Sequence, residues 1–256
     1  MSAAEHLIEA DLIFARDAEL EELRRRIHDR ASFLLHGESG AGKSFLVQHV
    51  IEEYPRVLYC PDSLTGQSVF RALANSLVSI GDPVVKRVWG RSAMEAIKTR
   101  SVLAVRGLVL DALRERRYFV VLDHLARTSA SLASDIRDIM FRGNTPVAAI
   151  ARSRHMEDLG FLSSFFTLRS EQMRIAPFNT VVATQFADLV ADHVGFRAAN
   201  RDEVLLRIAE RSGGLPGNIA ILVKMALLPK YRSMNRVKFT PMYIDFRLAW
   251  HAANAY

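Results

Sequence analysis

A glycine-rich segment at residues 37–44 constrains the fold of this 256-residue chain more than any other feature. Its sequence, GESGAGKS, fits the pattern G-x-x-x-x-G-K-[ST], which requires a strand before it and a helix after it. An apolar run at 32–36 precedes the segment, and apolar residues at helical spacing follow it over 45–53. A chance glycine-rich turn would not need these flanks. We therefore predict a buried parallel strand, a phosphate-binding loop and a helix.

The residue types in this loop explain how it would hold a triphosphate. Glycines let backbone N–H groups turn inward around the phosphates, and the helix that follows adds the positive end of its dipole. Lys43 is expected to reach the β- and γ-phosphates, and the Ser44 hydroxyl to ligate Mg²⁺. The predicted nucleotide-binding residues of the loop are Gly37, Glu38, Ser39, Gly40, Ala41, Gly42, Lys43 and Ser44.

Strands and helices alternate along the first two thirds of the chain. Further strands are predicted at 56–60, 118–122, 147–151 and 172–176, and helices at 17–30, 66–80, 94–116 and 129–142. This alternation is typical of a parallel sheet with helices on both faces. After Pro177 only helical periodicity remains, at 179–194, 201–212 and 216–228. We predict an α/β P-loop three-layer sandwich with a five-stranded parallel sheet in residues 1–177, then a small all-helical domain in residues 178–256.

An acid closes the third predicted strand. Asp123 follows the apolar run 118–122, and the carboxyl end of such a strand lies beside the phosphate loop, where an aspartate can hold Mg²⁺ through water. The alternative is an aspartate that only caps the next turn. His124 comes next, and a neutral imidazole is a weaker base for the attacking water than a carboxylate. The alternative is that His124 is only a loop residue, and with either interpretation the sequence predicts slow hydrolysis or a nucleotide-held switch.

With the loop and the acid, three further segments resemble the STAND and origin-initiator-like AAA+ ATPases. Residues 14–20, FARDAEL, are similar to the lead-in F-x-G-R-E-x-E-L, with Ala15 in place of glycine. Residues 147–153, VAAIARS, are similar to the family's fourth strand. Residues 212–219, SGGLPGNI, are similar to its G-x-P turn between two helices. The resemblance covers residues 12–228 and implies the same fold and an ATP site.

The resemblance also implies roles for individual residues. Phe14 and Arg16 would lie against the adenine, and Arg152 would sense the terminal phosphate near Asp123 and His124. The turn at Pro216 would face the nucleotide and couple its phosphate state to domain rotation. Each has a simpler alternative: Arg152 can be a surface arginine, with Arg154 a second candidate sensor, and the turn can be a plain connection between helices.

Composition narrows the class of protein further. The net charge of +6 is compatible with nucleic acid or another polyanion, although a net charge does not show a patch. One cysteine, Cys60, excludes a disulfide framework and fits the cytoplasm. We find no secretion signal at the N-terminus and no apolar stretch that would cross a membrane. In residues 229–256 basic and aromatic residues alternate, a pattern that can bind nucleic acid but more often packs a terminal helix.

The sequence therefore predicts a switch or slow ATPase that binds ATP and Mg²⁺ between a sheet domain and a helical domain. Its partners would be further copies of the chain, a DNA-bound assembly or an effector protein, and not a membrane. Transposition-accessory and replication-initiator-like ATPases are the DNA-linked branch that the resemblance implies. Two alternatives remain open. One is a P-loop kinase for a small substrate, with residues 86–100 as a lid over the phosphates. The other is a non-catalytic nucleotide-binding scaffold, which the histidine at position 124 would suit.

Overall fold

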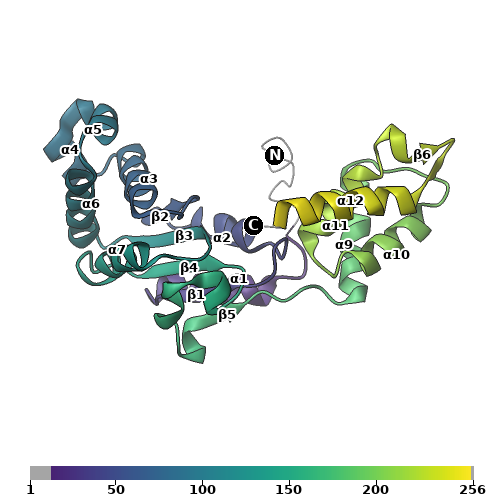
Figure 1. Ribbon diagram of the computed structural model, residues 1–256, viewed down its shortest axis with the longest axis horizontal. Coiled ribbons are helices and arrows are strands. Elements are labelled where there is room, and N and C mark those ends of the chain that lie inside the picture. Colours follow the sequence, from purple (N-terminus) through teal and green to yellow (C-terminus); the bar gives the residue numbers. More distant parts are fainter. Residues whose placement is uncertain (1–12, 255–256) are drawn as a thin grey trace. The chain divides into compact units, whose positions relative to one another are not determined.

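The computed structural model describes residues 13–254, which form two compact units (Figure 1). The sheet unit contains residues 18–37 and 43–175. The helical unit contains residues 13–17, 38–42 and 176–254. The expected absence of a secretion signal concerns residues that lie outside this description.

Five parallel strands form the sheet, as the sequence predicts. They are β1 (Phe33–His36), β2 (Val57–Cys60), β3 (Phe119–Leu125), β4 (Val147–Ala151) and β5 (Gln172–Arg174). Their order is β2-β3-β4-β1-β5, and every neighbouring pair is parallel. All residues of β4 are buried, as is typical of a strand covered on both faces. Because the strands are parallel, their carboxyl ends share one edge of the sheet.

Helices cover both faces of this sheet. They are α1 (Asp17–His28), α2 (Lys43–Ile51), α3 (Gly66–Ser79), α4 (Pro83–Trp89), α5 (Ala93–Thr99), α6 (Val102–Arg116), α7 (Ala130–Phe141) and α8 (Met156–Leu159), with short 3₁₀ turns at Gly90–Ser92, Phe161–Ser164 and Arg169–Glu171. Leu34 and Val120 share one core with α3 to α7. On the other face, the Arg26 guanidinium of α1 lies 5.2 Å from the centre of the Phe33 ring. The predicted three-layer α/β class is confirmed.

The prediction of one helix over residues 94–116 is wrong. The chain breaks between α5 and α6, where the Ser101 hydroxyl accepts the N–H of Ala104 at 3.3 Å and so caps a new helix. α4 was not predicted, although its start carries the usual signals. Pro83 occupies the first turn, and the Asp82 carboxylate accepts the N–H of Val84 at 2.8 Å.

The helical unit has its own hydrophobic core. Its elements are α9 (Thr180–His193), α10 (Arg201–Arg211), α11 (Pro216–Met225), a 3₁₀ turn at Pro229–Tyr231, the two-stranded hairpin β6 (Arg232–Ser233) and β7 (Arg236–Val237), and α12 (Phe239–Asn254). Phe186, Ile208 and Val223 are buried at its centre. The sequence predicted the helices, but it did not predict the hairpin.

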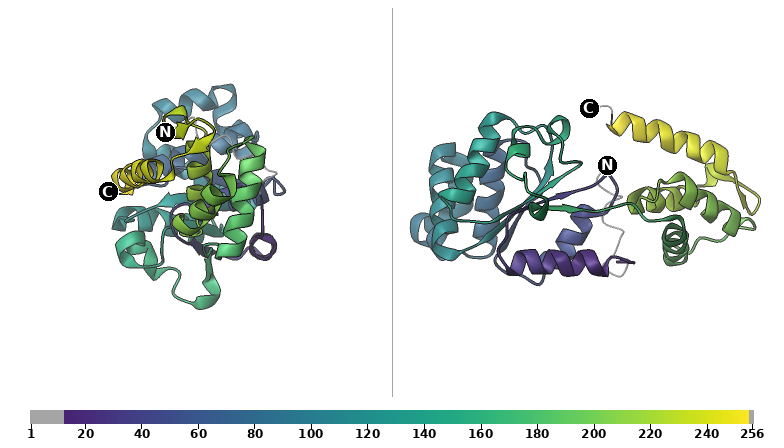
Figure 2. Two further views of the ribbon diagram at one scale, coloured as in Figure 1. Left: turned by 90° about the vertical axis from the view of Figure 1, so that its right-hand side faces the viewer. Right: turned by 90° about the horizontal axis from the view of Figure 1, so that it is seen from below.

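Phe239 and Phe246 of α12 belong to the core of the helical unit, and Tyr243 and Trp250 pack against it, so the packing interpretation is confirmed for these aromatic residues. Phe239 and Phe246 are buried. The guanidinium of Arg207 lies 5.8 Å from the centre of the Phe239 ring, and that of Arg211 lies 5.9 Å from Tyr243. α12 is drawn in yellow in Figure 2. Among the described residues, none of the helices is long and apolar enough to traverse a bilayer, and this includes α12 with its 16 residues.

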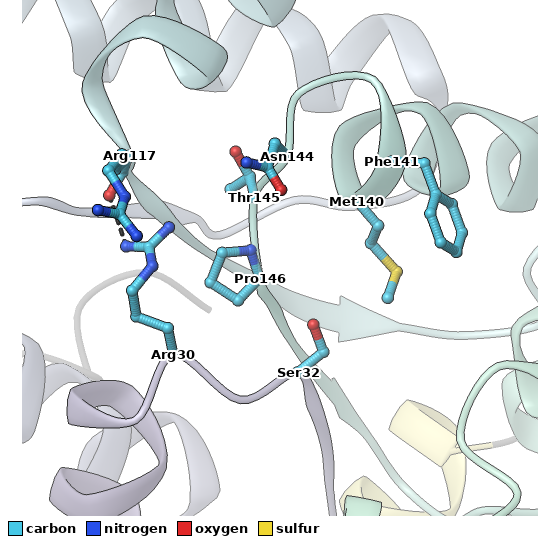
Figure 3. A pocket seen from close by; sticks show the side chains of 8 residues that line it. All are labelled: Arg30, Ser32, Arg117, Met140, Phe141, Asn144, Thr145 and Pro146. Atoms are coloured by element: carbon cyan, nitrogen blue, oxygen red, sulfur yellow. Dashed lines mark hydrogen bonds between the residues drawn. The ribbon is translucent and has the colours of Figure 1, made fainter.

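A pocket of about 380 Å³ lies at the amino-terminal edge of the sheet, opposite the edge that carries the phosphate loop (Figure 3). In it the Arg30 guanidinium donates to the carbonyl oxygen of Arg117 at 2.6 Å and to that of Tyr118 at 3.1 Å. Burial lowers the pKa of Arg30, and the charges of Arg117 and Arg56 lower it further. The lining residues are Arg30, Ser32, Arg117, Met140, Phe141, Asn144, Thr145 and Pro146. The predicted site residues lie elsewhere.

Candidate functional site

The glycine-rich loop has the backbone that its sequence requires. β1 ends at His36 and α2 begins at Lys43, so the loop joins a strand to the amino-terminal end of a helix. Gly40 and Gly42 have φ angles of 85° and 90°, a left-handed conformation that side chains disfavour. The Lys43 ammonium donates to the Gly37 carbonyl at 2.7 Å and so crosses the loop. A loop of this form can present backbone N–H groups to an anion.

Cations gather at the end of β1, next to this loop. The His36 imidazole is half-buried, and burial lowers its pKa below the ordinary value of 6.5. The charges of Arg154, Arg174 and Lys43 lower it further. The environment of His36 is not visible in the sequence, because its charges come from three separate segments. The concentration of positive charge suits a polyanionic ligand.

We predict that this histidine makes stability depend on pH. Because the folded chain holds the pKa of His36 below 6.5, the unfolded chain binds the proton first as the pH falls. The contribution of His36 to the free energy of unfolding should therefore be constant above pH 6.5. Below pH 6.5 the free energy of unfolding should decrease, by at most about 1.4 kcal/mol per pH unit from this group. Urea unfolding of wild type and His36→Gln at pH 8 and pH 5.5 measures this. A difference between the two proteins that stays the same at both pH values contradicts the prediction.

The loop tip, which we define as Glu38–Gly42, contacts the first turn of α11. The N–H of Gly217 donates to the carbonyl of Gly40 at 2.9 Å. A Cβ on Gly217 would lie 3.0 Å from the Cα of Gly40, so the two backbones meet where a side chain would crowd them. Pro216 stands in the first turn of α11, where its missing N–H costs no hydrogen bond. The predicted Pro216 turn and the loop tip are therefore adjacent within the helical unit.

Asp123 is a buried carboxylate at the carboxyl end of β3, with 1% of its surface exposed. One oxygen, Oδ1, accepts the N–H of His124 at 2.7 Å. The other, Oδ2, accepts the hydroxyl of Tyr59 at 2.6 Å. Burial, together with the hydrogen bond to Asp123, raises the pKa of Tyr59 well above its ordinary range, so the phenol is a proton donor. The Tyr59 hydroxyl accepts a hydrogen bond from Gln48 at 3.0 Å.

The donor set at this edge fits magnesium. Mg²⁺ prefers oxygen ligands and usually keeps several waters, with one or two protein groups and the substrate phosphates completing its shell. Asp123 supplies a carboxylate, and Ser44 supplies a hydroxyl in the first turn of α2. Within residues 13–254, no group of three His, Cys, Asp or Glu side chains could form an all-protein metal cage. An ion held mainly by water and phosphate is consistent with this.

His124 occupies an irregular position next to this acid. The register between β3 and β4 shifts between Leu122 and Leu125, and His124 has a φ of 54°. Its side chain is 70% exposed, and its Nε2 lies 3.9 Å from Oδ2 of Asp123. The imidazole is therefore open to solvent and adjacent to the acid, where a ligand or water could reach it.

Arg152 follows β4 at the same edge of the sheet. Its carbonyl accepts the N–H of Gly37 at 3.2 Å, which joins the end of β4 to the start of the phosphate loop. The residue is exposed. Arg154, the second candidate, donates to the side-chain oxygen of Gln172 at 3.4 Å. Of the two, Arg152 is the one whose backbone is bonded to the loop.

The lead-in segment packs within the helical unit. The Arg16 side chain is buried, with 6% exposed, and donates to the carbonyl of Ala176 at 2.7 Å. Its guanidinium lies 4.3 Å from the centre of the Phe178 ring, and the Phe14 ring centre lies 6.2 Å from that of Phe186. Ala15 has a φ of 50°, a conformation that explains why the lead-in motif carries glycine at this position. A contact with adenine stays a prediction.

A family model described as an AAA ATPase domain matches residues 13–140, which is half of the chain. The chain belongs to this family of AAA ATPases, which makes it an ATP-binding P-loop protein, as the resemblance implied. A comparison with curated proteins gave no match.

Solved structures share the fold. The Walker-type ATPase PABY2304 of Pyrococcus abyssi is 14% identical with a TM-score of 0.61, over 94% of this chain and 73% of that one. Cdc6p of Pyrobaculum aerophilum is 15% identical with a TM-score of 0.59, over 83% of this chain and 61% of that one. The ORC1 protein of Aeropyrum pernix, solved in complex with DNA, is 17% identical with a TM-score of 0.60, over 95% and 68%. At these identities the likeness concerns the fold alone.

Proposed function

We propose that the chain is a nucleotide-dependent switch that hydrolyses ATP slowly. The observation that carries the proposal is the contact between the loop tip and the first turn of α11, where the N–H of Gly217 donates to the carbonyl of Gly40 at 2.9 Å. A triphosphate on this loop would lie beside that helix turn, so the presence or loss of its terminal phosphate could shift the helices that follow. The domain limits proposed for this switch are 1–177 and 178–256.

The remaining residues receive roles in the same proposal. Ser44 and Asp123 hold Mg²⁺, and Lys43 faces the β- and γ-phosphates. Arg152 senses the terminal phosphate, because a guanidinium suits an oxyanion and its backbone is bonded to the loop. Phe14 and Arg16 line the adenine, and the turn at Pro216 transmits the phosphate state through its contact with the loop tip.

Slow hydrolysis follows from the residue after the acid. His124 is exposed and adjacent to Asp123, where a carboxylate would polarise the attacking water more strongly than a neutral imidazole. The bound triphosphate would then persist and hold the switch in one state.

We predict that His124→Glu increases ATP turnover roughly tenfold or more, because it supplies a carboxylate next to the attacking water. Release of phosphate under single-turnover conditions measures the rate. His124→Gln, which keeps a polar side chain without a carboxylate, is the control and should stay near the wild-type rate. An unchanged or lower rate in His124→Glu would mean that residue 124 does not lie next to the attacking water.

We propose that the chain acts in a DNA-linked assembly and that it also associates with further copies of itself. In residues 176–256, ten Lys and Arg residues against six Asp and Glu residues give +4 of the chain's +6. That excess is compatible with a phosphate backbone. Size-exclusion chromatography with ATP, ADP or no nucleotide, each with and without duplex DNA, tests assembly and DNA dependence together. An elution volume that never changes rejects both. A cytoplasmic location is part of the same proposal.

The kinase alternative receives less support. Residues 86–100 were its candidate lid, but Ala93 and Ile97 are buried in the core of the sheet unit, so this segment packs as α4 and α5. A lid needs a surface that opens and closes over the phosphates. The scaffold alternative differs from the switch in having no response to nucleotide, and the titration described for Lys43 below distinguishes the two.

A further inference from the structure

The hydroxyl of Tyr59 contacts the carboxylate of Asp123, and the proposed function gives this hydroxyl no role. Tyr59 lies on β2, Gln48 on α2 and Asp123 on β3, all within the sheet unit. The hydroxyl donates to Oδ2 of Asp123 at 2.6 Å and accepts from Gln48 at 3.0 Å. The Tyr59 hydroxyl therefore links α2, the helix that follows the phosphate loop, to Asp123 on β3.

We propose that Tyr59 is a latch that competes with Mg²⁺ for Oδ2 of Asp123 and so sets how much Mg²⁺ the protein needs to bind ATP. The proposal rests on the metal role of Asp123 given above. Oδ1 is held by the backbone N–H of His124, whereas Oδ2 is held by a side-chain hydroxyl that can rotate away, so Oδ2 is the oxygen that a metal-bound water would take. The Tyr59 hydroxyl occupies that oxygen in the structure described here.

The energetics give the competition a direction. A buried carboxylate oxygen without a partner is costly, and Asp123 is buried. The Tyr59 hydroxyl satisfies that oxygen and thereby stabilises the metal-free protein. When a metal-bound water takes Oδ2, the hydroxyl is displaced, and it keeps its hydrogen bond with Gln48 on the exposed side. Without the hydroxyl, only the metal-free state loses a bond, so Mg²⁺ should bind more readily.

The chain contains a matched control for this bond. The hydroxyl of Tyr118 donates to Oδ2 of Asp82 at 2.6 Å, and both residues are buried. Asp82 caps α4 and has no assigned ligand. Tyr118→Phe therefore removes the same kind of tyrosine–aspartate hydrogen bond at a place where no metal is expected.

The affinity for a fluorescent ATP analogue is measured at a series of free Mg²⁺ concentrations, from none (with EDTA) to millimolar. The midpoint is the free Mg²⁺ concentration at which half of the increase in affinity is reached. We expect this midpoint to fall about tenfold in Tyr59→Phe, the equivalent of one hydrogen bond to a charged group, and to stay unchanged in Tyr118→Phe. Thermal melting gives a second readout: both variants should melt lower without Mg²⁺, and only Tyr59→Phe should recover the loss with Mg²⁺ and ATP.

A milder variant avoids any loss of folding. Gln48→Ala removes only the exposed bond to the Tyr59 hydroxyl, which should weaken the donation to Asp123 and lower the midpoint by a smaller factor. A midpoint in Tyr59→Phe equal to or above that of wild type overturns the latch alone, provided that wild type responds to Mg²⁺ and Asp123→Ala does not. If the affinity of the wild type does not depend on Mg²⁺, the result expected for Asp123→Ala, both the metal role of Asp123 and the latch are overturned.

Discussion

Lys43→Ala is expected to weaken ATP binding roughly 10- to 100-fold, because it removes the cation that faces the phosphates. In the structure the Lys43 ammonium donates to the Gly37 carbonyl across the loop, and because an ammonium has three N–H donors it can also donate to a bound phosphate. Hydrogen bonds between an ammonium and a phosphate are charge-assisted and roughly twice as strong as bonds between neutral groups, so the loss of this side chain should be large. A titration with a fluorescent ATP analogue measures the affinity.

Lys224→Ala is the matched control, because it removes the same ammonium group from α11 and leaves the loop intact. Its affinity should stay within about twofold of wild type. If Lys43→Ala binds ATP as tightly as wild type does, the loop is not a phosphate site. In that case the scaffold alternative gains support, and the switch loses its ligand.

Much of the fold could be predicted because its signals are local. An apolar run of four or five residues, closed by a polar or glycine residue, marks each central strand, and Phe119 to Leu122 is the clearest case. The glycine loop adds a strict rule, because its pattern requires a strand before it and a helix after it. Together these features determine a parallel sheet with the loop at its carboxyl edge.

The errors in the helices also have local causes. Ser101 lies within one long stretch of helical periodicity, but its hydroxyl caps the start of α6, so the predicted single helix is two helices. Asp82 and Pro83 carried a start signal for α4 that the apolar pattern alone did not reveal. In both cases capping decided the boundary where periodicity did not.

The candidate site was predictable only in part. Lys43, Ser44 and Asp123 lie in motifs, so spacing along the chain was enough to select them. Tyr59 and His36 lie in no motif. The hydrogen bond of Tyr59 joins residues 64 positions apart, and the charges that act on His36 come from α2, from β5 and from the segment after β4. Only the register of the sheet brings such groups together, and a single sequence does not record it.

Gly214→Ala is expected to destabilise the protein by about 3 kcal/mol or more, the second large effect. Gly214 has a φ of 71°, and a Cβ there would lie 2.1 Å from the carbonyl oxygen of Phe178. That oxygen cannot move away easily, because the N–H of Phe178 donates to the carbonyl of Gly214 at 2.8 Å and holds the two backbones together. Urea unfolding followed by circular dichroism measures the loss.

Gly213→Ala separates the two causes of that loss. Gly213 has a nearly identical φ of 68°, but a Cβ there would meet nothing within 4 Å. It should therefore cost only the left-handed backbone strain, about 1–2 kcal/mol. Equal losses in the two variants would mean that Phe178 does not restrict Gly214. If the larger loss at Gly214 is found, packing alone explains that glycine, and the case for a nucleotide-facing turn then depends on Gly217 and its bond to Gly40.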